Sequence, residues 1–202
     1  MPATNAVIRP VEARDAAAVA AIYVPNITHG VASFELMPPD AAEMAARIAA
    51  TTATHPWLVC EAPEAGVAGY VYATAFNPRA AYQWSAAVTV YIDEKFHRAG
   101  IGRALYTSLF ALMRLQGFYN AYGGITLPNA GSVGLHEAMG FRPAAMYREV
   151  GYKFGRWWDV GWWEMELQPK PTVPTDPLKP ETVRELPGWQ AALDAGLPLL
   201  RL

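Results

Sequence analysis

Residues 90–105 read VYIDEKFHRAGIGRAL and join two stretches of different character. The residues before them, WSAAVT (84–89), are rich in β-branched and apolar types on both faces, which is typical of a central strand. After them, apolar residues recur at helical spacing to about residue 116. The sequence therefore predicts a strand, a tight turn and a helix in this order.

The turn between strand and helix contains two glycines and two arginines, a combination that suits an anion. The first N–H groups of a helix are unpaired and carry a partial positive charge. Gly100 and Gly102 would let a ligand approach the backbone, and Arg98 and Arg103 add positive charge. The P-loop pattern is absent, and Leu105 stands where GxGxxG needs a glycine. From these residues alone, phosphate binding and a plain tight turn remain the two interpretations.

The composition indicates one domain with a real core and a tail. The chain has 202 residues, of which 52% are hydrophobic and 17% charged, so it is too apolar for a disordered protein. A net charge of −2 favours neither nucleic acid nor an anionic membrane. The single cysteine, Cys60, excludes an internal disulfide framework and lies in an apolar run, which predicts inert packing. With no signal segment or membrane span in the sequence, we expect a soluble, cytoplasmic protein.

Helix and strand patterns alternate through residues 1–168, which predicts a single α/β domain. The expected strands are residues 6–10, 56–62, 66–76, 82–92 and 119–127, with an extended segment at 31–36 and a closing hairpin over 141–167. The expected helices are residues 12–27, 38–52, 101–116 and 129–140. Seven of the 17 prolines follow Gln168, so residues 169–202 are expected to form a proline-rich extension with one short helix within 181–196.

Two segments, VYIDEKFHRAGIGRAL and LPNAGSVGLHEAMGF, resemble the GCN5-related N-acetyltransferase (GNAT) superfamily, whose members transfer acetyl from acetyl-CoA to an amine. The superfamily motif is Gln or Arg, two residues, Gly, one residue, then Gly or Ala. Gly100 and Gly102 fit this motif, whereas His97 stands at its first position. The segments HPWLV, RAAYQW and YKFGRWWDVGWWEMEL narrow the resemblance to the phosphinothricin N-acetyltransferases over most of Ile8–Leu167.

This resemblance implies a mixed, mostly antiparallel sheet that splays open between two central parallel strands, with helices on both faces. The pantetheine arm of acetyl-CoA would lie in the gap, and its pyrophosphate on the turn. The implied cofactor-binding residues are Val90, Tyr91, Ile92, Arg98, Ala99, Gly100, Ile101, Gly102, Arg103, Asn129 and Ser132. Asn129 and Ser132 also suit helix capping, because LPNAGS is a helix-start signal. The four histidines are scattered without metal-ligand spacing, so no metal is expected.

The resemblance also indicates which catalytic residues of the family this sequence keeps and which it lacks. His136 matches a position that implies protonation of the departing CoA thiolate, although a helix histidine can equally be a packed residue. Ala87 replaces the glutamate that serves the family as acceptor base. Glu35 or His29, acting through water, is one substitute. The alternatives are an acceptor that needs no base, or a protein that binds acetyl-CoA without efficient transfer.

Four residues are candidates for the acceptor site. Arg79 matches an arginine that faces the acceptor carboxylate in related enzymes, a pairing that suits a guanidinium, although an exposed loop arginine is the alternative. Phe34, Tyr82 and Trp84 are candidates for the wall of the acceptor pocket, although aromatic residues in and beside strands more often belong to the core. The run WWDVGWW (157–163) is aromatic, and aromatic surface clusters favour interfaces, so we expect a homodimer.

The sequence thus predicts an acetyl-CoA-dependent N-acetyltransferase for a small amino-acid-like amine such as phosphinothricin, methionine sulfoximine or methionine sulfone. A polyamine or a peptide N-terminus is the alternative acceptor. A non-catalytic acyl-CoA-binding protein is the alternative class, motivated by Ala87 and the proline-rich tail.

Overall fold

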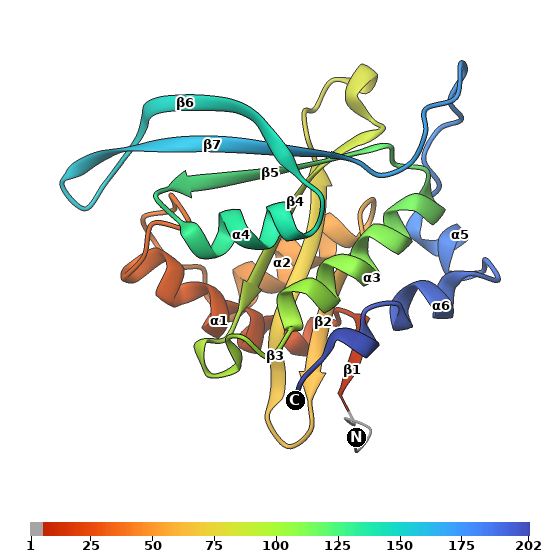
Figure 1. Cartoon of the computed structure of the whole chain (residues 1–202). Coiled ribbons are helices and arrows are strands. Elements are labelled where there is room, and N and C mark those ends of the chain that lie inside the picture. Colours follow the sequence, from red (N-terminus) through yellow and green to blue (C-terminus); the bar gives the residue numbers. More distant parts are fainter. Residues whose placement is uncertain (1–5) are drawn as a thin grey trace.

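The computed structural model describes residues 6–202, and its centre is one seven-stranded sheet in the order β1-β2-β3-β4-β5-β7-β6 (Figure 1). The strands are β1 Val7–Pro10, β2 Trp57–Ala62, β3 Gly66–Ala75, β4 Ser85–Ile92, β5 Asn120–Leu127, β6 Arg142–Lys153 and β7 Arg156–Glu166. All neighbouring strands run antiparallel except β4 and β5, which are parallel. The predicted mixed, mostly antiparallel sheet is confirmed.

The two parallel strands stay together over only a short distance. Ser85–Ala87 pair with Asn120–Tyr122. Beyond Ala87, β4 keeps its pairing with β3, and β5 keeps its pairing with β7 as far as Leu127. The strands therefore diverge after Ala87, as expected, and the edge of β4 over Val88–Ile92 has no recorded partner on the β5 side within the described residues.

Helices cover both faces of the sheet. They are α1 Ala16–Thr28, α2 Ala41–Thr52, α3 Ile101–Gln116, α4 Ala130–Ala138, α5 Pro180–Arg184 and α6 Trp189–Asp194, with 3₁₀ turns η1 Ala13–Asp15, η2 Ala80–Tyr82, η3 Glu94–Phe96 and η4 Leu197–Leu199. Because strand side chains alternate in direction, Val71 and Val88 enter the core beneath α3, while Tyr70 enters a second core beneath α1 and α2. The sheet is thus covered on both sides, as predicted for its central strand.

Local signals explain where the helices begin and end. The side chain of Asp40 accepts the N–H of Glu43 and caps α2, and α3 ends at Gly117, whose φ of 98° is the left-handed conformation that favours glycine. Residues 31–36, expected to be extended, form bends without strand pairing. The hydroxyl of Ser33 accepts the N–H of Glu35, a local bond that competes with an extended strand.

The C-terminal part of the chain, residues 169–202, packs along α3 (Figure 1). It contains two short helices, α5 and α6, and the 3₁₀ turn η4, so the expectation of one helix is wrong. The Pro187–Gly188 pair lies between the two helices and explains the break. Val183 and Leu193 are buried, which attaches this tail to the rest of the molecule.

Cys60 lies in β2 and is completely buried. Burial raises the pKa of its thiol to about 11, which keeps the group protonated and unreactive at neutral pH, as its surroundings in the sequence predict. Across residues 6–202, none of the helices combines the length and the apolar character required to span a bilayer. The same residues contain no cluster of three or more His, Cys, Asp or Glu that could hold a metal ion.

Candidate active site

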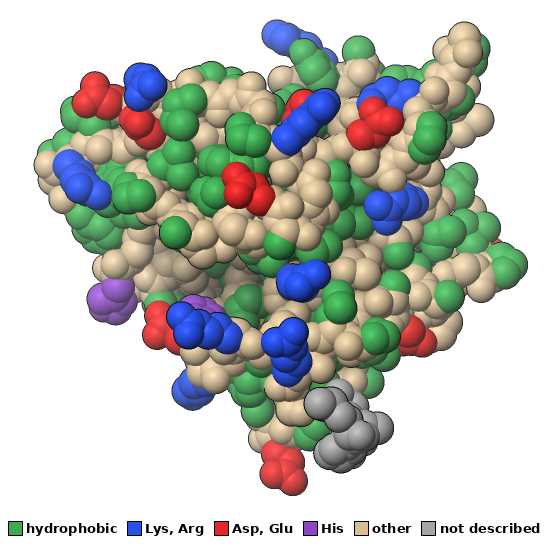
Figure 2. All heavy atoms as spheres, in the orientation of Figure 1, with side chains coloured by type: hydrophobic (Ala, Val, Ile, Leu, Met, Phe, Trp, Pro, Cys, Tyr) green, Lys and Arg blue, Asp and Glu red, His purple; other side chains and the backbone are tan. Residues whose placement is uncertain are grey.

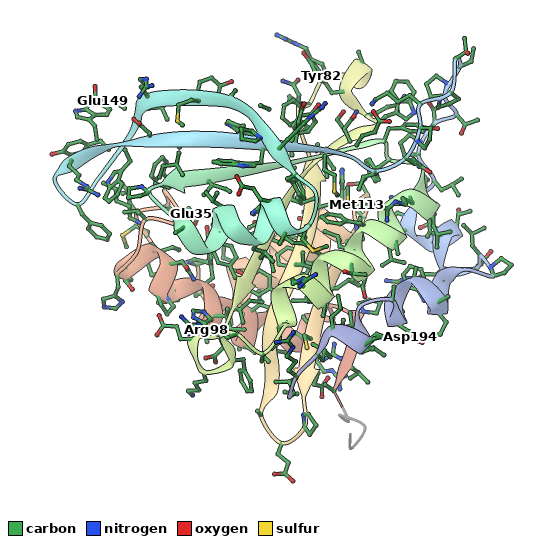
Figure 3. All side chains as sticks on the ribbon, viewed as in Figure 1. Glu35, Tyr82, Arg98, Met113, Glu149 and Asp194 are labelled. Carbon is green, nitrogen blue, oxygen red and sulfur yellow. The ribbon has the colours of Figure 1, made fainter. Side chains whose placement is uncertain are left out.

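The turn between β4 and α3 presents the N-terminus of α3 at the surface. Gly100 caps this helix with φ +80°, and its carbonyl accepts the N–H of Ala104. Arg98 and Arg103 are exposed, and Arg98 projects from the loop before α3 (Figure 3). Since the first helical N–H groups have no partner within the helix, this turn combines unpaired donors with positive charge. It has the chemical character predicted for a phosphate site.

Both glycines of this turn also lie against other parts of the protein. A Cβ added to Gly100 would overlap the carbonyl oxygen of Leu199 in the tail. A Cβ on Gly102 would lie 3.0 Å from the Cδ2 atom of Leu135 in α4. Close approach of a ligand is therefore not the sole reason for glycine at these positions, because two other elements of the chain already occupy the space.

The free edge of β4 runs toward this turn. Val90 pairs with Val71 on the β3 side and packs against the core beneath α3. Tyr91 points to the opposite face, where its ring meets that of Tyr23 edge-on at 5.0 Å. Because β5 has diverged here, the backbone groups of Val90–Ile92 on the other side can bind a ligand that adds as a strand. Of the predicted cofactor residues in the turn, Ile101 has a fully buried side chain, so its backbone alone is available.

Asn129 and Ser132 sit at the start of α4. The side-chain oxygen of Asn129 accepts the N–H of Ser132 at 3.0 Å, so the capping role is confirmed. Contact of either residue with the cofactor stays a prediction.

His136 is buried in α4, and its ring nitrogens form hydrogen bonds with Ser132 and Tyr106. Its Nδ1 lies 2.8 Å from the carbonyl oxygen of Ser132, which can only accept, so Nδ1 carries the proton. Its Nε2 lies 3.0 Å from the hydroxyl of Tyr106 and accepts from it in this tautomer. Burial lowers the pKa of His136 despite the bond to Ser132, which favours the neutral ring. Neutral His136 therefore has no free N–H, and its role as an acid stays a prediction.

A first cavity of about 300 Å³ lies between α1, α2 and the sheet. Glu35, Arg47 and Thr74 are among its lining residues. Thr74 is the cross-strand partner of Ala87, and directly opposed residues of an antiparallel pair point to the same face. The methyl group of Ala87 therefore faces the side of the sheet that carries this cavity, close to the point where β4 and β5 separate.

Glu35 is held by a network in this cavity. Arg47 donates to both of its carboxylate oxygens, at 2.7 and 3.0 Å, and the Tyr23 hydroxyl donates at 2.9 Å. Burial alone would raise the pKa of Glu35, but these bonds and the charges of Arg47 and Lys153 lower it overall. Burial, together with the neighbouring Glu35, raises the pKa of Tyr23 to about 12. Glu35 is thus ionised and firmly paired at neutral pH, which makes it a weak base.

Lys153, at the end of β6, ties the β6–β7 hairpin to the loop between α1 and α2. It is 4% exposed, and its Nζ donates to the carbonyl of Ser33 at 2.7 Å. Burial lowers the pKa of Lys153, and the nearby carboxylate of Glu35 opposes this shift. No sequence pattern indicated Lys153, Arg47 or Tyr23, because their contacts with this loop arise only from the tertiary fold.

The other predicted acceptor residues lie elsewhere. Arg79 and Tyr82 line a second cavity, of about 350 Å³, beside the C-terminal end of α3, whereas Trp84 donates its indole N–H to Thr175 of the tail at 2.7 Å. Phe34 packs against Gly151 of β6. Figure 3 shows the separation of Glu35 from Tyr82. His29, at the end of α1, is exposed and bonded to Thr28. The structure does not bring the predicted acceptor residues into one pocket.

Comparison with known proteins gives consistent results. The family model described as an acetyltransferase (GNAT) domain matches residues 8–162. The chain is 39% identical to a phosphinothricin N-acetyltransferase of Streptomyces viridochromogenes, over 85% of this chain and 93% of that protein. It is 29% identical to an L-methionine sulfoximine/L-methionine sulfone acetyltransferase of Pseudomonas paraeruginosa, over 84% and 99%.

The fold agrees with these matches. A phosphinothricin acetyltransferase from Sinorhizobium meliloti, solved in complex with AcCoA, superposes with a TM-score of 0.80 at 32% identity, covering 84% of this chain and 93% of that one. The splayed sheet and the glycine turn lie within the residues that the family model matches. The chain therefore belongs to the GNAT acetyltransferase family, and within it to the phosphinothricin N-acetyltransferases.

Proposed function

We propose that this protein transfers an acetyl group from acetyl-CoA to the amino group of a small amino-acid-like substrate of the phosphinothricin, methionine sulfoximine or methionine sulfone type. The observation that carries the proposal is the free edge of β4, which leads to the N-terminus of α3 and its exposed Arg98 and Arg103. Relatives that act on these substrates, and a similar structure with AcCoA bound, support the same activity.

The chain's residues fit acetyl-CoA along this edge. The two amides of the pantetheine arm can bond to the backbone of Val90–Ile92 as a strand would. The pyrophosphate can bond to N–H groups in the stretch Arg98–Gly102, with Arg103 alongside. A backbone N–H near Val90 would stabilise the oxyanion that forms on the thioester carbonyl.

The chemistry is a direct attack. The neutral amine nitrogen bonds to the thioester carbonyl carbon, the C–S bond of the resulting tetrahedral intermediate breaks, and the sulfur leaves as a thiolate. The nitrogen loses one proton, and the thiolate gains one. Because a free thiol has a pKa near ~8.5, water suffices to supply the second proton near neutral pH. His136 can supply it only when its N–H is released from the carbonyl of Ser132. Removal of the amine proton is the harder demand, because Ala87 offers no base.

We place the acceptor in the first cavity, because Ala87 and the end of the β4–β5 pairing border the same face. Glu35 can act on the amine through water, although Arg47 already neutralises it. The acceptor must then bind largely as the rare neutral amine. Arg79 is the proposed partner of the acceptor carboxylate, but it lines the second cavity. Thr74 at the first cavity and Ala75 at the second are adjacent in the chain, so an acceptor that pairs with Arg79 must extend past the end of β3 from one cavity to the other.

Because Ala87 provides no base, it favours a second candidate function, that of an acyl-CoA-binding protein without efficient turnover. The two candidates share a ligand and differ in product formation. Acetyl-CoA at ~100 times its dissociation constant should stabilise the fold by about 2.7 kcal/mol under either function. A thermal melt and a calorimetric titration measure this, and absence of binding at millimolar acetyl-CoA would contradict both.

We further propose a homodimer formed through the β6–β7 hairpin. β6 is an edge strand, and the hairpin extends beyond the body of the molecule (Figure 1). Its exposed apolar side chains are Met146, Tyr147, Val150, Tyr152, Phe154 and Trp157. Exposed apolar surfaces of this kind mark protein–protein interfaces, and analytical ultracentrifugation would test whether the protein is a dimer.

We also propose that residues 1–168 form the catalytic domain and that residues 169–202 are an extension attached to it. The proposed location is the cytoplasm.

A further inference from the structure

We propose that the C-terminal segment, residues 193–202, forms part of the cofactor site and that Arg201 binds a phosphate group of CoA. This inference rests on the proposed function and adds to it a residue outside the stretch that the family model matches. Its basis is the contact between this segment and the turn that begins α3.

The segment is firmly anchored along α3. The hydroxyl of Ser108 donates to the carbonyl of Leu193 at 2.7 Å and accepts the N–H of Gly196 at 3.0 Å. Ser108 is completely buried, and Leu193 and Leu200 belong to the core cluster beneath α3. These contacts fix the backbone of the segment on both sides of residue 196.

The end of the segment reaches the glycine turn itself. The backbone N–H of Arg201 donates to the carbonyl of Ala99 at 2.9 Å. The carbonyl oxygen of Leu199 fills the position where a side chain at Gly100 would begin. The end of the chain accordingly lies beside the start of α3 in Figure 1. The backbone of Arg201 is therefore bound to Ala99, the residue that precedes the N-terminal cap of α3.

The exposed positive charges near the start of α3 are suited to binding an anion. Arg98, Arg103 and Arg201 are all exposed, and none of them takes part in the salt bridges described for residues 6–202. Figure 2 shows Lys and Arg side chains gathered near the start of α3, just below the centre of the view. The helix N-terminus adds positive potential to these three charges. This combination favours the binding of a polyanion.

CoA carries two such anionic groups, the pyrophosphate and the 3′-phosphate of its ribose. The pyrophosphate is assigned to the turn, where the backbone N–H groups converge. An arginine that approaches from the tail side can contact either group, and a guanidinium matches phosphate geometry through two parallel bonds. Arg201 is thus inferred to be a binding residue for the nucleotide end of CoA, with no part in the chemical step.

The test compares the affinities of purified full-length variants for CoA by isothermal titration calorimetry at low salt. Arg201→Ala should weaken CoA binding roughly fivefold, the upper range for an exposed charge pair. Arg201→Lys should recover part of the affinity, because the charge remains. The matched control is Arg184→Ala, which removes an exposed arginine from α5 in the same tail and should bind CoA like the wild type.

Titration with a second ligand, 3′-dephospho-CoA, identifies which phosphate group of CoA Arg201 contacts. An Arg201→Ala effect that disappears with this ligand places the contact at the 3′-phosphate, and an effect that persists places it at the pyrophosphate; both support the inference. If the wild type binds CoA but Arg201→Ala binds it equally well, the inference is overturned and the proposed function stands. If the wild type binds no CoA, the proposed function itself fails.

Discussion

Replacing Ala87 by glutamate adds a carboxylate to the face of β4 that borders the first cavity. Ala87 is half-buried and opposes Thr74, which lines this cavity of about 300 Å³. The longer side chain extends from the face of the sheet that carries this cavity, and the destabilisation should stay near about 1 kcal/mol, the lower end for added core volume. Because Arg47 already neutralises Glu35, the new carboxylate meets little net repulsion there and is available to the acceptor amine.

The expected gain follows from the protonation of the acceptor. An amino-acid amine is mostly protonated at pH 7, so an enzyme without a base must capture the rare neutral form. The wild-type kcat/KM should then rise about tenfold per pH unit until the pKa of the amine is reached. A positioned general base contributes about 10²–10⁴-fold, but one grafted without supporting hydrogen bonds contributes less. We expect Ala87→Glu to raise kcat/KM at pH 7 about tenfold and to flatten the pH profile.

The assay is thiol release from acetyl-CoA between pH 6 and 9 with a fixed acceptor. Ala87→Gln is the matched control, because it has nearly the same shape and no basic carboxylate, and it should keep the steep wild-type profile. A wild-type profile that is already flat above pH 7, with Ala87→Glu only slower, would refute this reasoning. The base would then be another group, and Glu35→Gln would be the next variant to assay.

Three further variants test individual residues of the site. Arg79→Ala should raise the acceptor KM about tenfold or more in steady-state kinetics and leave acetyl-CoA affinity unchanged, since one charge-assisted bond is lost; an unchanged KM would remove Arg79 from the acceptor site. His136→Leu should lower kcat less than tenfold while lowering the Tm, because the buried hydroxyl of Tyr106 loses its acceptor; a fall in kcat above 100-fold with an unchanged Tm would identify His136 as the acid. Gly102→Val should weaken acetyl-CoA binding in calorimetry and lower the Tm, because its side chain meets Leu135; wild-type affinity would contradict this.

The fold was largely predictable, because its signals are local. The strand before residue 93, the turn and the helix after it are adjacent in the chain, and each has its own periodicity or capping residue. The LPNAGS signal predicts a helix start at Asn129, and the side chain of Asn129 accepts a capping hydrogen bond. The splayed sheet came from the resemblance to a family, since no periodicity in the sequence indicates where two strands separate.

The site was less predictable, because its contacts join distant residues. The sequence predicts that Gly100 makes room for a ligand, whereas Leu199, near the other end of the chain, fills that space. The tail was expected to be a proline-rich extension, and its few buried residues, such as Leu193, are too widely spaced to form a helical pattern. Glu35 could be selected as a candidate base, but its pairing with Arg47 depends on how α2 packs beside the preceding loop.

The most direct test of the central claim is product formation from acetyl-CoA with phosphinothricin, methionine sulfoximine and methionine sulfone as acceptors. The wild-type protein is incubated with each acceptor at pH 8.5, where the neutral amine is more abundant. Thiol release is followed in solution, and the acceptor is analysed by mass spectrometry. We expect one CoA released per acetyl group found on the amino nitrogen of at least one acceptor. Thiol release no faster than in the acceptor-free control, with no acetylated product from any of the three, would contradict the proposed function.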